Sequence, residues 1–199
     1  MARTPFSARI EVHTTSLTKT DTASADLSAT ETGAISGTDL DLTIDGLSGG
    51  TKLHSRVIVI GDTVYASNRD GRWEVSSRTQ MAFAIDAILL EVRRTVNGDQ
   101  LADLGEETLD GRAVHHLTLT APVTIHDPVN GEIVFDAFDL WVLADGSPVL
   151  RRTESHASKG VMTSSGISET HYDGFGTAIE IRPPKLPATP EPSKRPARP

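Results

Sequence analysis

The sequence contains no cysteine, and only 5% of its residues are aromatic. Without thiols the chain cannot form disulfides, thiolate metal sites or a cysteine nucleophile. No stretch approaches the roughly 18 consecutive apolar residues of a membrane-spanning helix. Large aromatic side chains are scarce, so a core must be built mainly from aliphatic residues.

The charge balance is acidic, with 27 Asp and Glu residues against 19 Lys and Arg residues and a formal net charge of −8. An acidic surface repels the phosphates of nucleic acids, so no nucleic-acid partner is expected. The 199 residues suffice for one domain with a sizeable core. From Pro183 the sequence is rich in proline and aperiodic. We therefore expect a single domain over 1–183 and a disordered or extended tail over 184–199.

Alternation of apolar and polar residues with period two is the dominant pattern, and it predicts strands with one buried face. Turns rich in Gly, Ser and Thr separate these segments, which favours an antiparallel meander. Asp-Gly pairs at several junctions suit hairpin turns, because these residues tolerate positive φ. The predicted strands are 7–13, 22–30, 38–45, 53–60, 63–67, 72–75, 113–120, 138–144, 148–157, 163–172 and 177–182.

The segment 80–94 breaks this rhythm. It is rich in residues that favour helices and contains neither Gly nor Pro. In a helix its apolar residues would form one stripe and, near the opposite side, a second smaller group. Two apolar sides suggest packing against the sheet on one side and against another element, or a ligand, on the other. The sequence thus predicts an α+β fold, an antiparallel sheet with one amphipathic helix.

Motifs for catalysis or metal binding are missing. The seven histidines show no ligand spacing, and there is no GxSxG, P-loop or GxGxxG motif. Asp39, Asp41 and Asp45 share one strand face, and a solvated face explains them better than a calcium site, which usually gathers its ligands on a tight loop. We expect no catalytic residue, no metal and no cofactor.

The order of elements is similar to that of a known family. The hairpin RVIVIGDTVYASNRDGRWEVS precedes AFAIDAILLEV, and then come LADLGEETLDGRAVHHLTLTA, FDLWVLADGSPVLRR and ISETHYDGFGTAIEIRPP. This arrangement resembles the LppX/LprAFG family of bacterial lipoproteins, distant relatives of the LolA/LolB lipoprotein carriers. The matching residues are Gly61, Tyr65, Asp70, Gly71, Trp73, Gly105, Glu106, Asp110, Gly111, Trp141, Asp145, Gly146, Pro148, Ile181 and Pro183.

This resemblance implies a strongly curved half-barrel whose concave face is covered by helix, leaving an apolar cavity. It also implies a non-enzymatic, monomeric carrier in the cell envelope that binds an acyl lipid, a glycolipid or another apolar ligand. Family members are anchored through a lipid on an N-terminal cysteine. That cysteine, the signal peptide and the usual helix before the first strand are missing here, and we expect truncation to be the reason.

Small residues support the same idea independently. Ala8, Ala23, Ala25 and Ala29 lie on the apolar sides of two predicted strands. They would either leave room for a ligand or let a helix approach closely. The predicted ligand-binding residues are Met81, Phe83, Ile85, Ile88, Leu89 and Leu90 in the helix and Ile10, Val12, Leu27, Leu40 and Leu42 in the sheet. The alternative is an envelope interaction or sensor module with the same fold and no cavity.

Overall fold

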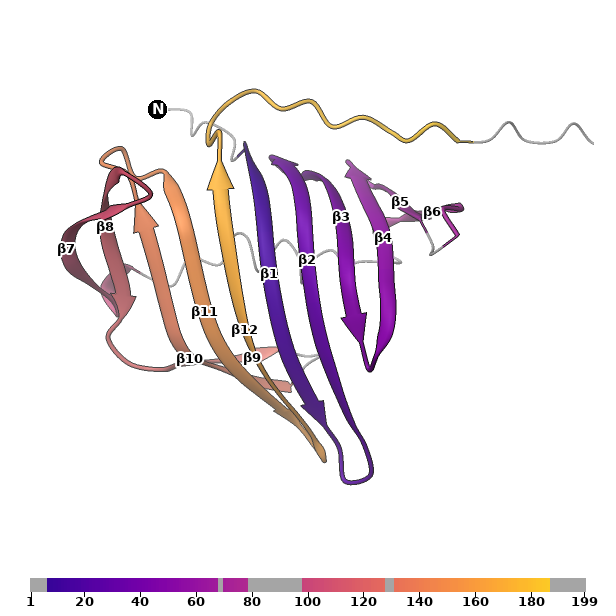
Figure 1. Cartoon of the computed structure of the whole chain (residues 1–199), viewed down its shortest axis with the longest axis horizontal. Helices are drawn as coiled ribbons and strands as arrows, with labels where there is room; N and C mark the ends of the chain where they lie inside the picture. Colours follow the sequence, from indigo (N-terminus) through magenta and orange to yellow (C-terminus); the bar gives the residue numbers. More distant parts are fainter. Residues whose placement is uncertain (1–6, 68–69, 79–97, 128–130, 187–199) are drawn as a thin grey trace, which may run out of the picture.

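In the computed structural model of the chain, residues 7–67, 70–78, 98–127 and 131–186 are described, and β-strands dominate these ranges (Figure 1). In chain order the strands are β1 (Ser7–Lys19), β2 (Ser24–Ser36), β3 (Asp39–Ser48), β4 (Thr51–Ile60), β5 (Thr63–Ser67), β6 (Trp73–Ser77), β7 (Leu101–Leu109), β8 (Arg112–Leu119), β9 (Val123–Asp127), β10 (Gly131–Val142), β11 (Pro148–Lys159) and β12 (Met162–Asp173). One short 3₁₀-helix, η1 (Gly98–Gln100), precedes β7.

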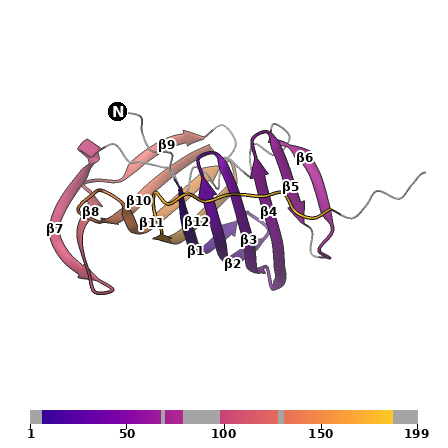
Figure 2. The same cartoon turned by 90° about the horizontal axis from the view of Figure 1, so that it is seen from above.

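All twelve strands belong to one open antiparallel sheet. Their order is β6-β5-β4-β3-β2-β1-β12-β11-β10-β8-β7, and β9 pairs with β10 beside this path. Strands β1 to β6 form a meander, and β12 then pairs with the other side of β1. The two halves of the chain therefore join at the centre of the sheet, through β1 and β12. Figures 1 and 2 show that the sheet is curved, with β6 and β7 at its two ends.

Period-two patterning explains why these segments pair as they do. Ala8, Ile10 and Val12 on β1 alternate with exposed polar residues, and each is buried. A shift of one residue in register would turn all of them to the solvent face, so the buried set determines the pairing. The predicted turn at Asp110 and Gly111 is confirmed, because both residues have positive φ (49° and 76°) between β7 and β8.

The predicted α+β class with a covering helix is wrong. The described chain forms one open sheet of twelve strands, and short hairpin turns link most successive strands, so its backbone hydrogen bonds are made by strand pairing. The expected helix over 80–94 lies outside the described residues. The α+β class rested on that one segment, whereas strands with period-two alternation make up most of the described ranges. No helix in the described part of the chain is long and apolar enough to cross a lipid bilayer.

The segment after β12 also differs from expectation. Residues 177–182 were predicted to be a strand, yet they are not in the sheet. The Gly176 N–H donates to the Ser7 carbonyl over 2.8 Å, and Ser7 Oγ donates to the Thr177 carbonyl over 2.7 Å. From there the chain crosses over the ends of β1 to β4 in both views (Figures 1 and 2). Alternation alone does not distinguish a paired strand from an extended segment lying across strand ends.

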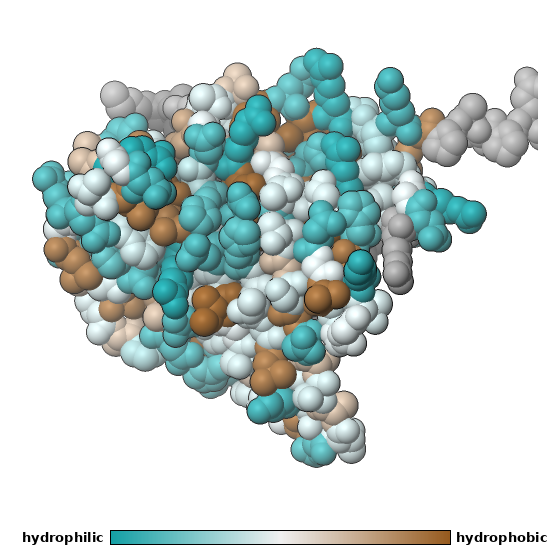
Figure 3. All heavy atoms as spheres, in the orientation of Figure 1, coloured by the Kyte–Doolittle hydropathy of each residue, from teal (hydrophilic) through white to brown (hydrophobic). Residues whose placement is uncertain are grey.

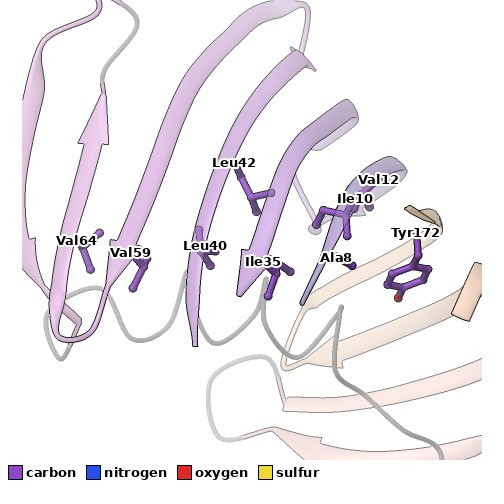
Figure 4. Packing of buried hydrophobic residues seen from close by; sticks show 9 residues of the cluster. All are labelled: Ala8, Ile10, Val12, Ile35, Leu40, Leu42, Val59, Val64 and Tyr172. Carbon is purple, nitrogen blue, oxygen red and sulfur yellow. The ribbon is translucent and has the colours of Figure 1, made fainter. Parts of the chain in front are cut away.

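The main hydrophobic cluster follows six neighbouring strands from β5 to β12 (Figure 4). It contains aliphatic residues at 0–5% exposure and one aromatic residue, Tyr172. Its members are Ala8, Ile10, Val12, Ile35, Leu40, Leu42, Val59, Val64 and Tyr172, with Val57 packed against them. The core is thus aliphatic, as the low aromatic content requires.

Candidate functional site

Strand pairing divides the side chains between two faces of the sheet. Ile10 lies directly opposite Gly33 on β2 and Tyr172 on β12, and Gly33 lies opposite Leu42 on β3. Directly opposed residues point to the same side of a sheet. The cluster of Figure 4 therefore occupies one side, called here the apolar face. The other side, the polar face, carries most of the exposed charged residues of β1 to β4 and is visible in Figure 3.

The apolar face changes character along its strands. Near the start of β1 it is packed, with Ile10 and Val12 at 4% and 5% exposure. Towards the end of β1 the same face continues with small side chains that are only half-buried. These are Thr14, Ser16 and Thr18 on β1, Ser168, Gly166 and Ser164 on β12, and Ser155 and Ala157 on β11. This wall of small, half-buried residues, called here the small-residue wall, leaves surface that a ligand can contact.

The predicted binding residues fall into three groups. Ile10, Val12, Leu40 and Leu42 belong to the buried cluster, where the protein already covers them. Leu27 is half-buried and lies directly opposite Ser16, within the small-residue wall. Met81, Phe83, Ile85, Ile88, Leu89 and Leu90 lie outside the described residues. Among the described predictions, only Leu27 has a side chain at the half-buried end of the apolar face.

Sequence reasoning did not identify the serine and threonine residues of this wall. Ser16, Ser155 and Ser168 have polar side chains, so hydropathy alone places them on a solvated face. Alternation along β1 could have placed Ser16 on the apolar face, because Ser16 continues the even-numbered series that begins with Ala8 and Ile10. What the sequence does not reveal is that β12 pairs with β1 and β11 pairs with β12, which brings these residues together.

A buried cation also lies on the apolar face. Arg151 on β11 is 2% exposed, and its Nη2 donates to Thr170 Oγ1 over 3.0 Å. Thr170 is fully buried, and the two residues are directly opposite each other in the β11–β12 ladder. Burial of a guanidinium is costly unless hydrogen bonds or counter-charges compensate it. The Thr170 hydroxyl supplies one such hydrogen bond.

Histidine–carboxylate pairs are a second feature of the sheet. His54 Nδ1 lies 2.6 Å from Asp45 Oδ1, and His156 Nδ1 lies 2.7 Å from Asp136 Oδ2. His116 stacks on Trp141 with ring centroids 4.4 Å apart, and the Trp141 indole N–H donates to Glu107. Within the described ranges no three such side chains are grouped to hold a metal ion. The pairs are therefore arranged as separate cross-strand contacts.

Asp41 has a structural partner on the polar face. The Arg56 Nε and Nη2 atoms donate to the two carboxylate oxygens of Asp41 over 2.8 and 2.6 Å. These hydrogen bonds raise the pKa of Arg56 above its usual value. Asp45 pairs with His54, and Asp39 Oδ1 accepts the Gly61 N–H over 2.9 Å. The three aspartates thus bind separate neighbours, in keeping with a solvated strand face.

Comparison with solved structures shows what kind of fold this is. The chain is similar to LprF from Mycobacterium bovis, with a TM-score of 0.50 at 15% identity over 90% of both chains. It also matches the Mycobacterium tuberculosis lipoprotein LppX, with a TM-score of 0.46 at 16% identity over 88% of this chain and 89% of the other. A putative outer membrane lipoprotein-sorting protein domain from Vibrio parahaemolyticus matches with a TM-score of 0.30 at 10% identity over 86% and 87%.

No family model and no curated protein matches the sequence. The fold is that of LprF, which confirms, at the level of the fold, the resemblance to the LppX/LprAFG lipoproteins. At 15% identity the similarity establishes the architecture and leaves the ligand to be argued from the chain itself.

Proposed function

We propose that the protein is a non-enzymatic lipid carrier of the bacterial cell envelope that holds an acyl lipid against the apolar face of its sheet. The observation that carries the proposal is the small-residue wall, where Ser16, Leu27 and Ser168 are half-buried on the face that is otherwise a packed core. The LprF-type fold supports it.

Small side chains suit an acyl chain for a physical reason. A wall of Ser, Thr, Ala and Gly occupies little volume, so a bound chain can fill the space and complete the packing. Each buried methylene group contributes about 0.8 kcal/mol. Burial of a dozen such groups would supply roughly 10 kcal/mol before the cost of association is subtracted. Hydrophobic burial of one or two acyl chains is therefore sufficient for stable holding.

Lipid content and lipid uptake test this function. Protein purified from a bacterial host is extracted with organic solvent and examined by native mass spectrometry, and a delipidated sample is titrated with a fluorescent fatty acid. We expect a bound acyl lipid in the first measurement and saturable uptake in the second. A lipid-free protein that takes up no fatty acid would contradict the carrier function and favour an interaction module.

Adjacent residues on opposite faces provide matched variants. Ser16→Trp places a large side chain in the small-residue wall, whereas Thr15→Trp places the same side chain on the polar face. We expect Ser16→Trp to reduce uptake at least tenfold and Thr15→Trp to leave it unchanged. Equal uptake by the two variants would show that the ligand does not use this wall. Far-UV circular dichroism and thermal melting check that both variants fold.

A further inference from the structure

The polar face contains a hollow on the side of the sheet opposite the proposed lipid site. Its volume is 540 Å³, and it extends across β2, β1, β12, β11 and β10. Most of its lining residues have side chains on the polar face, among them Thr15, Leu17 and Ile167. The remaining lining residues, Ser16, Leu27, Ser155 and Gly166, belong to the small-residue wall, so the hollow and the wall lie on the two sides of the same stretch of the single-layered sheet.

The floor of the hollow is apolar and exposed. Leu17 is 38% exposed and Ile167 is 41% exposed, and they lie diagonally across the β1–β12 pair, with Thr15 directly opposite Ile167. Leu47 on β3, at 44% exposure, lies beside Ser28 of the lining. Single exposed aliphatic residues are common, but neighbouring ones within a hollow are typical of an interaction site.

Carboxylates lie at both ends of this floor. Asp26 is directly opposite Leu17, and Glu154 is directly opposite Ile167, with Asp136 also in the lining. The lining contains no Lys, Arg or His. Asp136 pairs with a histidine and Glu154 with an arginine, but these side chains are 43–52% exposed. Exposed pairs contribute little free energy, so a cationic partner can compete for these carboxylates.

We propose that this hollow docks a polypeptide segment that has an apolar centre and Lys or Arg residues on both sides of it. Five adjacent strands span about 19 Å, which corresponds to roughly six residues of an extended peptide. The apolar centre would contact Leu17 and Ile167, and the flanking cations would lie near Asp26 at one end and Glu154 at the other. The hollow is open, so a small cation would keep most of its surface in water, whereas a peptide buries the whole floor.

Binding of synthetic peptides to the full chain tests the proposal. One labelled peptide has leucines flanked by lysines, and the control has the same leucines flanked by glutamates. We expect fluorescence anisotropy to detect saturable binding of the lysine peptide, weakened by added salt because screening reduces charge attraction. Binding of both peptides alike, or of neither, would overturn the proposal. Preference for anionic lipid vesicles over the lysine peptide would also overturn it.

Point variants test whether the lysine peptide binds in the hollow. Ile167→Thr should lower affinity for the lysine peptide about tenfold, since it removes most of one apolar contact. Asp26→Asn should lower it about threefold, as expected for an exposed charge pair. The matched controls are Val75→Thr on β6, where Val75 is 57% exposed, and Asp62→Asn in the β4–β5 turn. Controls that weaken binding as much as their counterparts would show that binding is not at the hollow.

The lipid-carrier function and the peptide-docking site can be tested separately. Thr15→Trp fills the hollow and should abolish peptide binding while leaving fatty-acid uptake intact, whereas Thr14→Trp, in the small-residue wall and outside the lining of the hollow, should have the opposite effects. Loss of uptake without loss of peptide binding would contradict only the carrier function. Retention of peptide binding in Thr15→Trp would contradict only the docking site.

Discussion

Two leucines on β3 test the assignment of the two faces. Leu42 is fully buried in the apolar cluster, and Leu47, five residues later, is 44% exposed on the polar face. Leu42→Ala and Leu47→Ala delete the same atoms from the same strand. Both variants therefore change β-propensity in the same way, and the difference between their free energies of unfolding measures the effect of side-chain burial.

The structure indicates a large cost at Leu42. A buried Leu→Ala substitution costs about 2–5 kcal/mol, depending on how well the surroundings collapse into the cavity. One cross-strand neighbour of Leu42 is Gly33, which has no side chain to move into the gap, and the other is Val57. We therefore expect about 3–4 kcal/mol for Leu42→Ala and about 0.5 kcal/mol or less for Leu47→Ala.

Chemical and thermal denaturation measure this difference. For a domain of this size about 1 kcal/mol lowers Tm by roughly 2–4 °C, so Leu42→Ala should lower it by about 6–16 °C. The Leu47→Ala variant should melt within about 2 °C of the parent protein. Equal losses of stability in both variants would refute the register of β3 and, with it, the division of the sheet into an apolar and a polar face.

Three further substitutions test local contacts. Gly33→Ala should destabilise the sheet by about 2 kcal/mol or more, because a Cβ at this position would lie 1.9 Å from the Asp41 carbonyl oxygen. Urea denaturation measures this loss, and an unchanged unfolding midpoint would refute the close approach of β2 and β3. Asp41→Asn should cost less than about 1 kcal/mol, since its pair with Arg56 is partly exposed, and the loss should shrink in high salt. The N–H of Ser147 lowers the pKa of Asp145, so the stabilising effect of the carboxylate is present above about pH 4 and is lost as pH falls through the lowered pKa. Asp145→Ala should therefore lower Tm more at pH 7 than in acid, and equal losses at both would exclude this linkage.

Several features of the fold were predictable because they are local. Alternation at Ala8, Ile10 and Val12 marks a strand and its buried side, and Asp110-Gly111 marks a hairpin turn whose positive φ values the structure confirms. The resemblance to the LppX/LprAFG proteins also came from sequence order, and the similarity to LprF confirms it at the level of the fold. The strand and turn predictions depend on neighbours in the chain, whereas the resemblance depends on the order of motifs from Gly61 to Pro183.

Other expectations were wrong for a physical reason. The α+β class rested on helix propensity in one segment, and residues 177–182 were predicted to be a strand from alternation. Neither property specifies the partner of a segment. An extended segment becomes a strand only when a free sheet edge accepts its hydrogen bonds, and 177–182 crosses strand ends instead.

Local sequence patterns indicated most of the strands and several of the turns, because these follow from backbone sterics and period-two hydropathy, but they missed β7 and β9 and wrongly included 177–182. Only the tertiary structure placed β12 beside β1, and so gathered Ser16, Ser155 and Ser168 into one wall and Leu17 and Ile167 into one hollow. Pairing between distant strands is governed by the free energy of the whole sheet, which no single segment of the chain encodes.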